Sequence, residues 1–118
     1  MGPAYGASAA RHAEIAAHDL RHLVDFDLAL ADGTIDAVIL TTPNTMHEAQ
    51  VVRAAAAGKH VFCEKPLGLT GDSARRSVAA CEKAGVILGI GHERRFEPAL
   101  IEVRRMIEEG ALGTIMHA

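Results

Sequence analysis

Three short apolar runs, separated from one another by helix-like stretches, constrain the fold of this chain more than any other feature. DAVILTT at 36–42, HVFC at 60–63 and VILGIG at 86–91 are largely apolar and have the length of buried strands. Short strands of this kind that alternate with amphipathic helices are typical of parallel sheets. The pattern therefore predicts an α/β fold, a doubly wound parallel sheet with right-handed crossovers and helices on both faces.

The helical stretches carry start and stop signals. Residues 45–48 have the S/T-x-x-E form of a capping box, and the alanine-rich run behind them ends at Gly58. A second helix is expected from Thr70 to Gly85, and a third is expected to stop at Gly110, before the strand-like TIMHA. The expected apolar faces are Ala74, Val78 and Cys81 on the second helix and Leu100, Val103 and Ile107 on the third.

Length and composition narrow the class of protein. The 118 residues are 49% hydrophobic with a net charge of −3, which predicts one globular domain over 1–118. Mixed charges and scarce aromatic residues argue against a nucleic-acid or membrane surface. No apolar stretch approaches the ~20 residues of a membrane span, so the cytoplasm is the expected location. Cys63 and Cys81 lack CxxC spacing and lie in apolar segments, so reduced core thiols are expected, with a disulfide as the alternative.

Polar clusters follow each of the three predicted strands. They are Thr42-Pro43-Asn44, Glu64-Lys65-Pro66 and the run from His92 to Arg95. In doubly wound sheets the carboxyl ends of the strands meet at one edge, and ligands bind outside that edge. The three clusters are therefore expected to form one ligand site.

The same residues carry a resemblance to a known family. The ordered motifs TPN..H, AGKHV..EKP and GH..RF closely resemble the second half of the nucleotide-binding domain of the Gfo/Idh/MocA oxidoreductases, over about residues 24–118. The resemblance implies a partial Rossmann domain that binds NAD or NADP. It also implies hydride transfer to or from a small-molecule substrate, namely a sugar, a polyol such as a cyclitol, or a related hydroxy compound.

The resemblance also implies roles for individual residues. Lys65 would be the catalytic lysine, since oxidation of an alcohol needs a group that takes the hydroxyl proton. Glu64 would hold the cofactor's ribose, and Arg95 would lie near the cofactor or substrate. The predicted cofactor-binding residues are Thr42, Pro43, Asn44, His47, Glu64, Pro66 and Arg95.

Each of these residues also has an ordinary structural interpretation. A lysine at a strand end is commonly a solvated charge, His47 could be an exposed helix histidine, and Arg94 and Arg95 could form surface ion pairs. Pro66 fits either an ordinary turn or a cis peptide bond. No metal site is expected, since two histidines at i, i+4 in the 11–23 stretch have no evident third ligand.

The ends of the chain depart from the family pattern. The first glycines read GPAYG rather than G-x-G-x-x-G, and the stretch before Asp36 is a helix-like 11–23 and a short helix that stops near Gly33. The first strands and the second domain are therefore expected to be missing. The alternative function is a non-catalytic, truncated half-domain that associates with another chain or with itself as a homo-oligomer.

Overall fold

The computed structural model describes residues 17, 23 and 25–117, and the chain divides into two compact units, Met1–Ile35 and Asp36–Ala118. In the first unit the structure describes one helix, α2 (Phe26–Ala31), in agreement with the short helix expected before Gly33. The side chain of Asp25 accepts a hydrogen bond from the backbone of Asp27 and caps this helix. The helix-like 11–23 and the GPAYG segment lie almost entirely outside the described residues.

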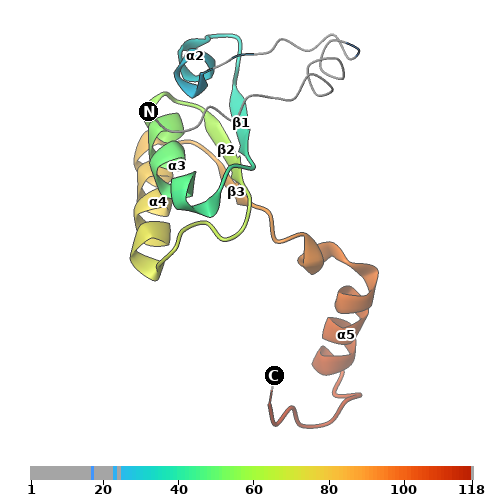
Figure 1. The fold of residues 1–118 in the computed structure, drawn as a ribbon. Helices are drawn as coiled ribbons and strands as arrows, with labels where there is room; N and C mark the ends of the chain where they lie inside the picture. The colour runs from blue at the N-terminus through green and yellow to red at the C-terminus, as the bar shows by residue number, and fades with distance from the viewer. Residues whose placement is uncertain (1–16, 18–22, 24, 118) are drawn as a thin grey trace. The chain divides into compact units, whose positions relative to one another are not determined.

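The second unit contains a three-stranded parallel sheet in the order β1-β2-β3 (Figure 1). The strands are β1 (Ala37–Leu40), β2 (His60–Cys63) and β3 (Leu88–Ile90), each within one of the three apolar runs. The α/β class with a partial, Rossmann-like parallel sheet is therefore confirmed.

The helices of this unit follow the strands in turn. After β1 come a 3₁₀ turn, η1 (Asn44–Met46), and α3 (His47–Ala56), while α4 (Gly71–Ala84) connects β2 to β3. After β3 come a second 3₁₀ turn, η2 (Glu93–Phe96), and α5 (Pro98–Glu108). Positive φ angles at Gly58, Gly85 and Gly110 confirm the predicted helix ends, because glycine adopts this conformation without strain.

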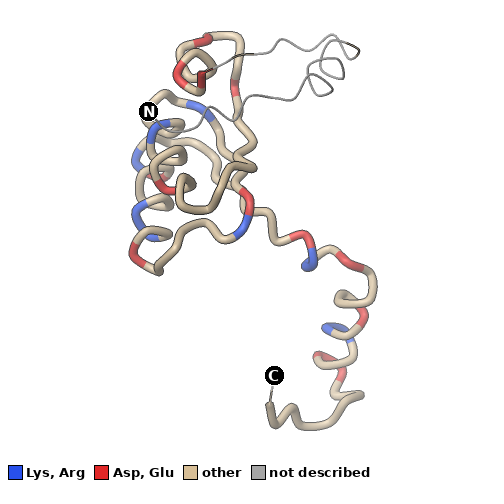
Figure 2. Tube along the Cα trace, viewed as in Figure 1, with Lys and Arg blue, Asp and Glu red and all other residues tan. Residues whose placement is uncertain are grey.

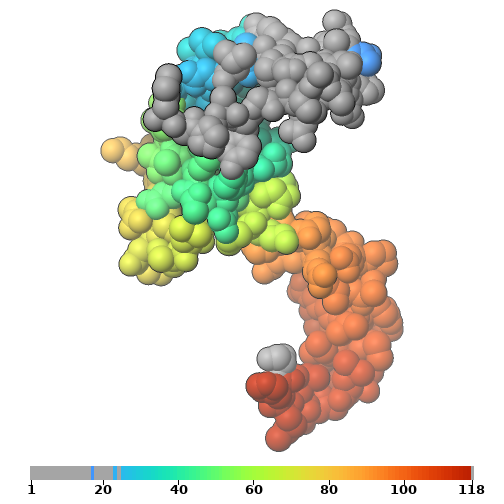
Figure 3. Space-filling view, viewed as in Figure 1, coloured from blue at the N-terminus to red at the C-terminus, as the bar shows by residue number. Residues whose placement is uncertain are grey.

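The core lies between the sheet and α3. This helix packs against β1, β2 and α4, and in the space-filling view α3 and α4 form one continuous surface (Figure 3). The side chains of Leu40, Val61 and Cys63 on this face of the sheet are buried. On the opposite face Ile39 is 72% exposed and Phe62 44% exposed. The prediction of helices on both faces is therefore wrong for the part of the chain that the structure describes.

Four local predictions also need correction. The capping box at 45–48 does not form, since α3 begins one residue later than predicted, with Met46 at its N-cap and no side-chain cap. A capping box does form between Thr70 and Ser73 at the start of α4.

On α4 the inward face is Ser73, Ser77 and Cys81, while Val78 is 39% exposed. The hydroxyl of Ser77 donates to the carbonyl of Ser73, which lets a small polar side chain be buried. Residues 114–117 do not form a strand, and the apolar residues of α5 are not buried by any described residue.

Both cysteines are free and buried, as predicted. Burial raises the pKa of the Cys63 thiol to about 11, with a smaller contribution from the negative charge of Glu64. Among the described residues, no helix is both long and apolar enough to span a membrane.

Candidate functional site

Three loops follow the carboxyl ends of the strands, and backbone hydrogen bonds align them. The amide of Glu64 donates to the carbonyl of Leu40 at 2.9 Å, and the amide of Gly91 donates to that of Cys63 at 2.9 Å. These bonds continue the parallel ladder one residue past β1, β2 and β3. The predicted clusters that begin at Thr42, Glu64 and His92 therefore leave the sheet at the same edge.

His47 connects the first two of these loops. Its side chain is 1% exposed, with Nδ1 2.7 Å from the carbonyl oxygen of Pro66 and Nε2 2.9 Å from that of Thr42. One turn later on α3, Gln50 accepts a hydrogen bond from the Thr42 hydroxyl. The structure buries His47 between two loops, so the interpretation of an exposed helix histidine is wrong. Its predicted contact with the cofactor stays a prediction.

The loop after β2 presents the predicted catalytic residue. Lys65 and Pro66 are exposed, Glu64 is half-buried, and the Lys65–Pro66 peptide bond is cis. One carboxylate oxygen of Glu64 accepts a hydrogen bond from the Lys65 amide at 3.1 Å. The lysine ammonium and a carboxylate thus come from adjacent residues at the end of the central strand.

Gly91 makes room for that carboxylate. A Cβ atom built on Gly91 would lie 3.1 Å from the carboxyl carbon and from both carboxylate oxygens of Glu64. A larger residue would therefore crowd the Glu64 carboxylate, which would have to shift by a few tenths of an ångström. The sequence signal for this contact is a glycine directly after the third apolar run, but its partner, 27 positions earlier in the chain (91 − 64), follows only from the strand register.

The third loop is exposed throughout its predicted cluster, from His92 to Arg95. Arg94 and Arg95 belong to η2 and line a cavity of about 620 Å³ together with residues of α5. Among the residues that the structure describes, neither arginine forms an ion pair, in contrast to one of their sequence interpretations. The arginines of α5 do pair, since Arg104 bonds to Glu108 and Arg105 to Glu102 and Glu109. Figure 2 shows this alternation of acidic and basic residues along α5.

The structure thus brings the first two predicted clusters together and places the third beside them. Thr42 and Pro66 belong to one hydrogen-bonded unit organised by His47, while Glu64 is half-buried and Pro43, Asn44 and Lys65 are exposed beside it. Sequence reasoning missed Gln50 as a part of this unit and Gly91 as the neighbour of Glu64.

A parallel sheet with polar loops at its carboxyl edge defines a ligand-binding α/β domain of the nucleotide-binding type. Comparison with known proteins agrees: the chain belongs to the Gfo/Idh/MocA family, described as an oxidoreductase family with an NAD-binding Rossmann fold, and residues 4–92 match it. The match begins at residue 4 rather than near residue 24, so the likeness extends further toward the N-terminus than the motifs indicated. The predicted cofactor class, NAD or NADP, is that of this fold.

Similar proteins act on sugars and cyclitols. The chain is 44% identical over 84 residues to 1,5-anhydro-D-fructose reductase of Ensifer adhaerens, covering 71% of this chain and 25% of the reductase. It is 39% identical over 84 residues to scyllo-inositol 2-dehydrogenase (NAD(+)) of Bacillus subtilis (strain 168), again covering 71% and 25%.

The structure is also similar to that of the WlbA dehydrogenase from Bordetella pertussis, solved in complex with NADH and UDP-GlcNAcA. The TM-score is 0.81 and the identity 36%, over 88% of this chain and 30% of the dehydrogenase. This chain therefore spans between a quarter and a third of the length of these relatives.

Proposed function

We propose that this chain forms the nicotinamide side of the cofactor site in an NAD(P)-dependent oxidoreductase that acts on a sugar, a cyclitol or a related hydroxy compound. The observation that carries the proposal is the exposure of Lys65 beside Glu64 at the end of the central strand, in a chain of this family. The proposal covers residues 36–118, and the remainder of the cofactor and substrate sites would come from other residues.

The side chains at this edge fit a nicotinamide cofactor by their chemistry. The half-buried Glu64 carboxylate accepts one bond, from the Lys65 amide, and has capacity for the hydroxyl donors of a ribose. The exposed amide of Asn44 offers both a donor and an acceptor. Gly91 leaves the space in which the Glu64 carboxylate lies. These residues would hold the ribose nearest the reacting ring.

Lys65 would move the proton of the reaction. A bound nicotinamide cofactor supplies the chemistry of accepting a hydride from the carbon that carries the substrate hydroxyl. Lys65 Nζ, in its neutral form, would take the proton from that hydroxyl as the carbonyl forms, and its ammonium would return the proton in the reducing direction. The side chain is exposed in this chain, so its desolvation would come from the bound cofactor and substrate.

A chimera tests the role of Lys65. Because the chain spans a quarter of the anhydrofructose reductase, its aligned segment can replace the corresponding one in that enzyme. Lys65→Met in the chimera is expected to lower kcat by about 10²-fold to 10⁴-fold, the usual contribution of general acid–base catalysis. The matched control is Lys83→Met in the last turn of α4, which should leave kcat unchanged. Full turnover of the Lys65→Met chimera would contradict the catalytic assignment.

A second candidate function is suggested by the exposed apolar residues. Ile39 and Phe62 on the open face of the sheet, and Leu100 and Ile101 on α5, are all more than two-fifths exposed. Such surfaces favour association, either with a second copy or with another chain, and would suit a non-catalytic half-domain. Light scattering during size-exclusion chromatography distinguishes the two, since a monomer at high concentration argues against the associating half-domain. The cytoplasmic location and the homo-oligomer stay predictions.

A further inference from the structure

We propose that His47 is a doubly protonated, buried imidazolium that ties the first two site loops together and thereby positions Lys65. Its role is that of a positioning residue, because its buried side chain contacts the loops rather than the space at the edge of the sheet. This link between the two loops, the His47 staple, follows from the hydrogen-bond geometry alone. Its effect on catalysis rests on the proposed function of Lys65.

The hydrogen-bond partners of His47 determine its protonation state. A neutral imidazole carries one N–H donor and one acceptor nitrogen, and only the imidazolium carries two donors. Both nitrogens of His47 face carbonyl oxygens, which accept and never donate, at 2.7 and 2.9 Å. A neutral ring would therefore place a nitrogen lone pair against one of these oxygens. Turning the ring by half a turn would put carbon atoms at both positions and lose both bonds.

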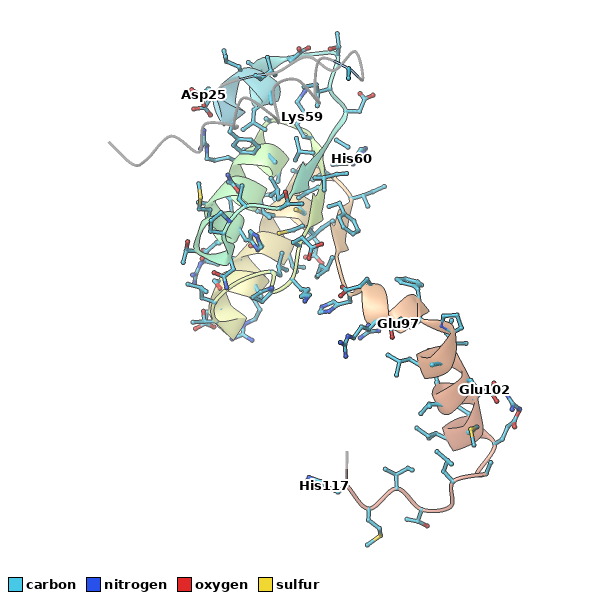
Figure 4. The ribbon with its side chains drawn as sticks, turned by 45° about the vertical axis from the view of Figure 1, so that its right-hand side comes forward. Asp25, Lys59, His60, Glu97, Glu102 and His117 are labelled. Atoms are coloured by element: carbon cyan, nitrogen blue, oxygen red, sulfur yellow. The ribbon has the colours of Figure 1, made fainter. Side chains whose placement is uncertain are left out.

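His60 provides a contrast within the same molecule. The backbone amide of Ile87 donates to Nδ1 of His60 at 3.0 Å, so that nitrogen is an acceptor and the ring is neutral with its proton on Nε2. His60 is exposed at the amino end of β2 (Figure 4), far along the strand from the loops at its carboxyl end. Two histidines of one chain thus have opposite hydrogen-bonding environments.

The charged groups near His47 do not by themselves determine whether its ring is charged. On α3 the neighbouring Glu48 is engaged with Arg76 of α4, and the loop after β2 carries Glu64 and Lys65. The loop after β1, residues 41–43, has no charged residue. Burial and the N-terminus of α3 both disfavour a cation. Two charge-assisted hydrogen bonds to carbonyl oxygens offset these costs, because such bonds are stronger than neutral ones.

The staple acts on Lys65 through the backbone. The Pro66 carbonyl is the group that His47 Nδ1 holds, and Pro66 follows Lys65 directly. Nε2 of the same ring bonds to the Thr42 carbonyl, and the hydroxyl of Thr42 donates to the side chain of Gln50. The loop after β2, which carries Lys65, is thereby fixed to the end of β1 and to α3. Loss of one ring proton would break one of the two bonds and free one loop from the other.

Nitrogen-15 NMR of the histidine rings in the 118-residue chain tests the proposal directly. At neutral pH both ring nitrogens of His47 are expected to show the chemical shift of protonated nitrogen, with through-bond couplings to the Pro66 and Thr42 carbonyls. His60 is expected to show one protonated and one bare nitrogen. The signals are assigned by their loss in His47→Gln and, as the matched control, His60→Gln. A bare nitrogen at His47 in the folded chain would overturn the proposal.

A pH series separates positioning from simple packing. When the pH is raised until His47 loses a proton, the amide signals of Lys65 and Leu67 are expected to shift in step with it. Those of Gly58 and Gly85, at the opposite edge of the sheet, should not. Movement of His47 without any response at Lys65 and Leu67 would overturn the positioning role. Both experiments use the chain without cofactor, so their result is independent of whether the Lys65→Met chimera retains turnover.

Discussion

The two faces of the β-sheet carry similar side chains but have opposite environments. Leu40 and Cys63, which lie side by side in the register, are 3% and 0% exposed beneath the helical layer of α3 and α4. Ile39 and Phe62, one position earlier on the same two strands, are 72% and 44% exposed. The apolar character of a strand residue therefore does not by itself place that residue in the core. The crossover helices determine which face is buried, and the same α3 also holds the site loops through His47.

The largest expected effect compares a leucine-to-alanine change on the covered face with an isoleucine-to-alanine change on the open face. Leu40→Ala should lower the free energy of unfolding by about 2 to 5 kcal/mol, because it removes buried methyl groups and leaves a cavity. Ile39→Ala should change it by less than about 0.5 kcal/mol, as is usual for exposed positions. Urea unfolding of the two variants measures both values. Equal losses would show that the open face is covered in solution.

The next effect is a pH dependence that belongs to the covered face. The pKa of Cys63 is raised by burial to about 11 from an ordinary value of 9.0. The folded state therefore binds this proton more tightly, and the stabilisation is complete below about pH 9 and lost as the pH rises toward 11. The wild-type chain should lose about 2 to 3 kcal/mol over that range in excess of Cys63→Ala. Parallel stability curves for the two proteins would contradict the assignment.

The smallest expected effect concerns the ion pair that joins the two helices at the surface. Arg76 of α4 donates to both carboxylate oxygens of Glu48 on α3, and this bond lowers the pKa of Glu48. Because Glu48 is deprotonated more readily in the folded state, the stabilisation is present above its unfolded pKa and lost on acidification. Arg76→Gln should therefore destabilise the chain slightly at neutral pH. The loss should be smaller than that of Leu40→Ala and smaller than the pH-dependent loss assigned to Cys63.

Acid titration provides the check on this pair. The difference between the wild-type chain and Arg76→Gln should disappear as the pH falls through the lowered pKa of Glu48. The matched control is Arg75→Gln, whose partner Asp72 lies on the same helix and joins no second element. An Arg76→Gln effect that persists in acid would mean that the arginine acts by packing rather than by charge.

Local sequence patterns predicted the elements well where one signal acted alone. β2 coincides with the predicted HVFC, and the three helices end at glycines with positive φ. The capping box at 45–48 does not form: Thr45 lies inside the 3₁₀ turn η1, and Glu48 bonds to Arg76, 28 positions away. The inward face of α4 was predicted only in part: Cys81 is buried as expected, but Ser73 and Ser77 complete the face, because serines can be buried when their hydroxyls bond to backbone carbonyls.

The site followed the same division. The position of Lys65 and Glu64 at the carboxyl end of β2 could be predicted, because the apolar run and the motif that follows it are local features of the sequence. Their roles in a cofactor site stay predictions. The burial of His47 could not be predicted, because its two partners lie 5 and 19 positions away and come together only when the loop after β2 folds over α3. Gly91 was missed for the same reason, since the carboxylate above it comes from a neighbouring strand.

The central claim, that the carboxyl edge of this sheet receives a nicotinamide cofactor, is tested most directly by titrating the isotope-labelled chain with NADH. Amide signals of 42, 44–46, 64, 65, 67 and 91–95 are predicted to shift, while those of Gly58 and Gly85, in the loops that precede β2 and β3, stay in place. Chemical shifts respond even to weak binding, so the contacts made by these loops alone are enough to give a signal. Shifts confined to the opposite edge, or no shift at the highest NADH concentration, would contradict the account.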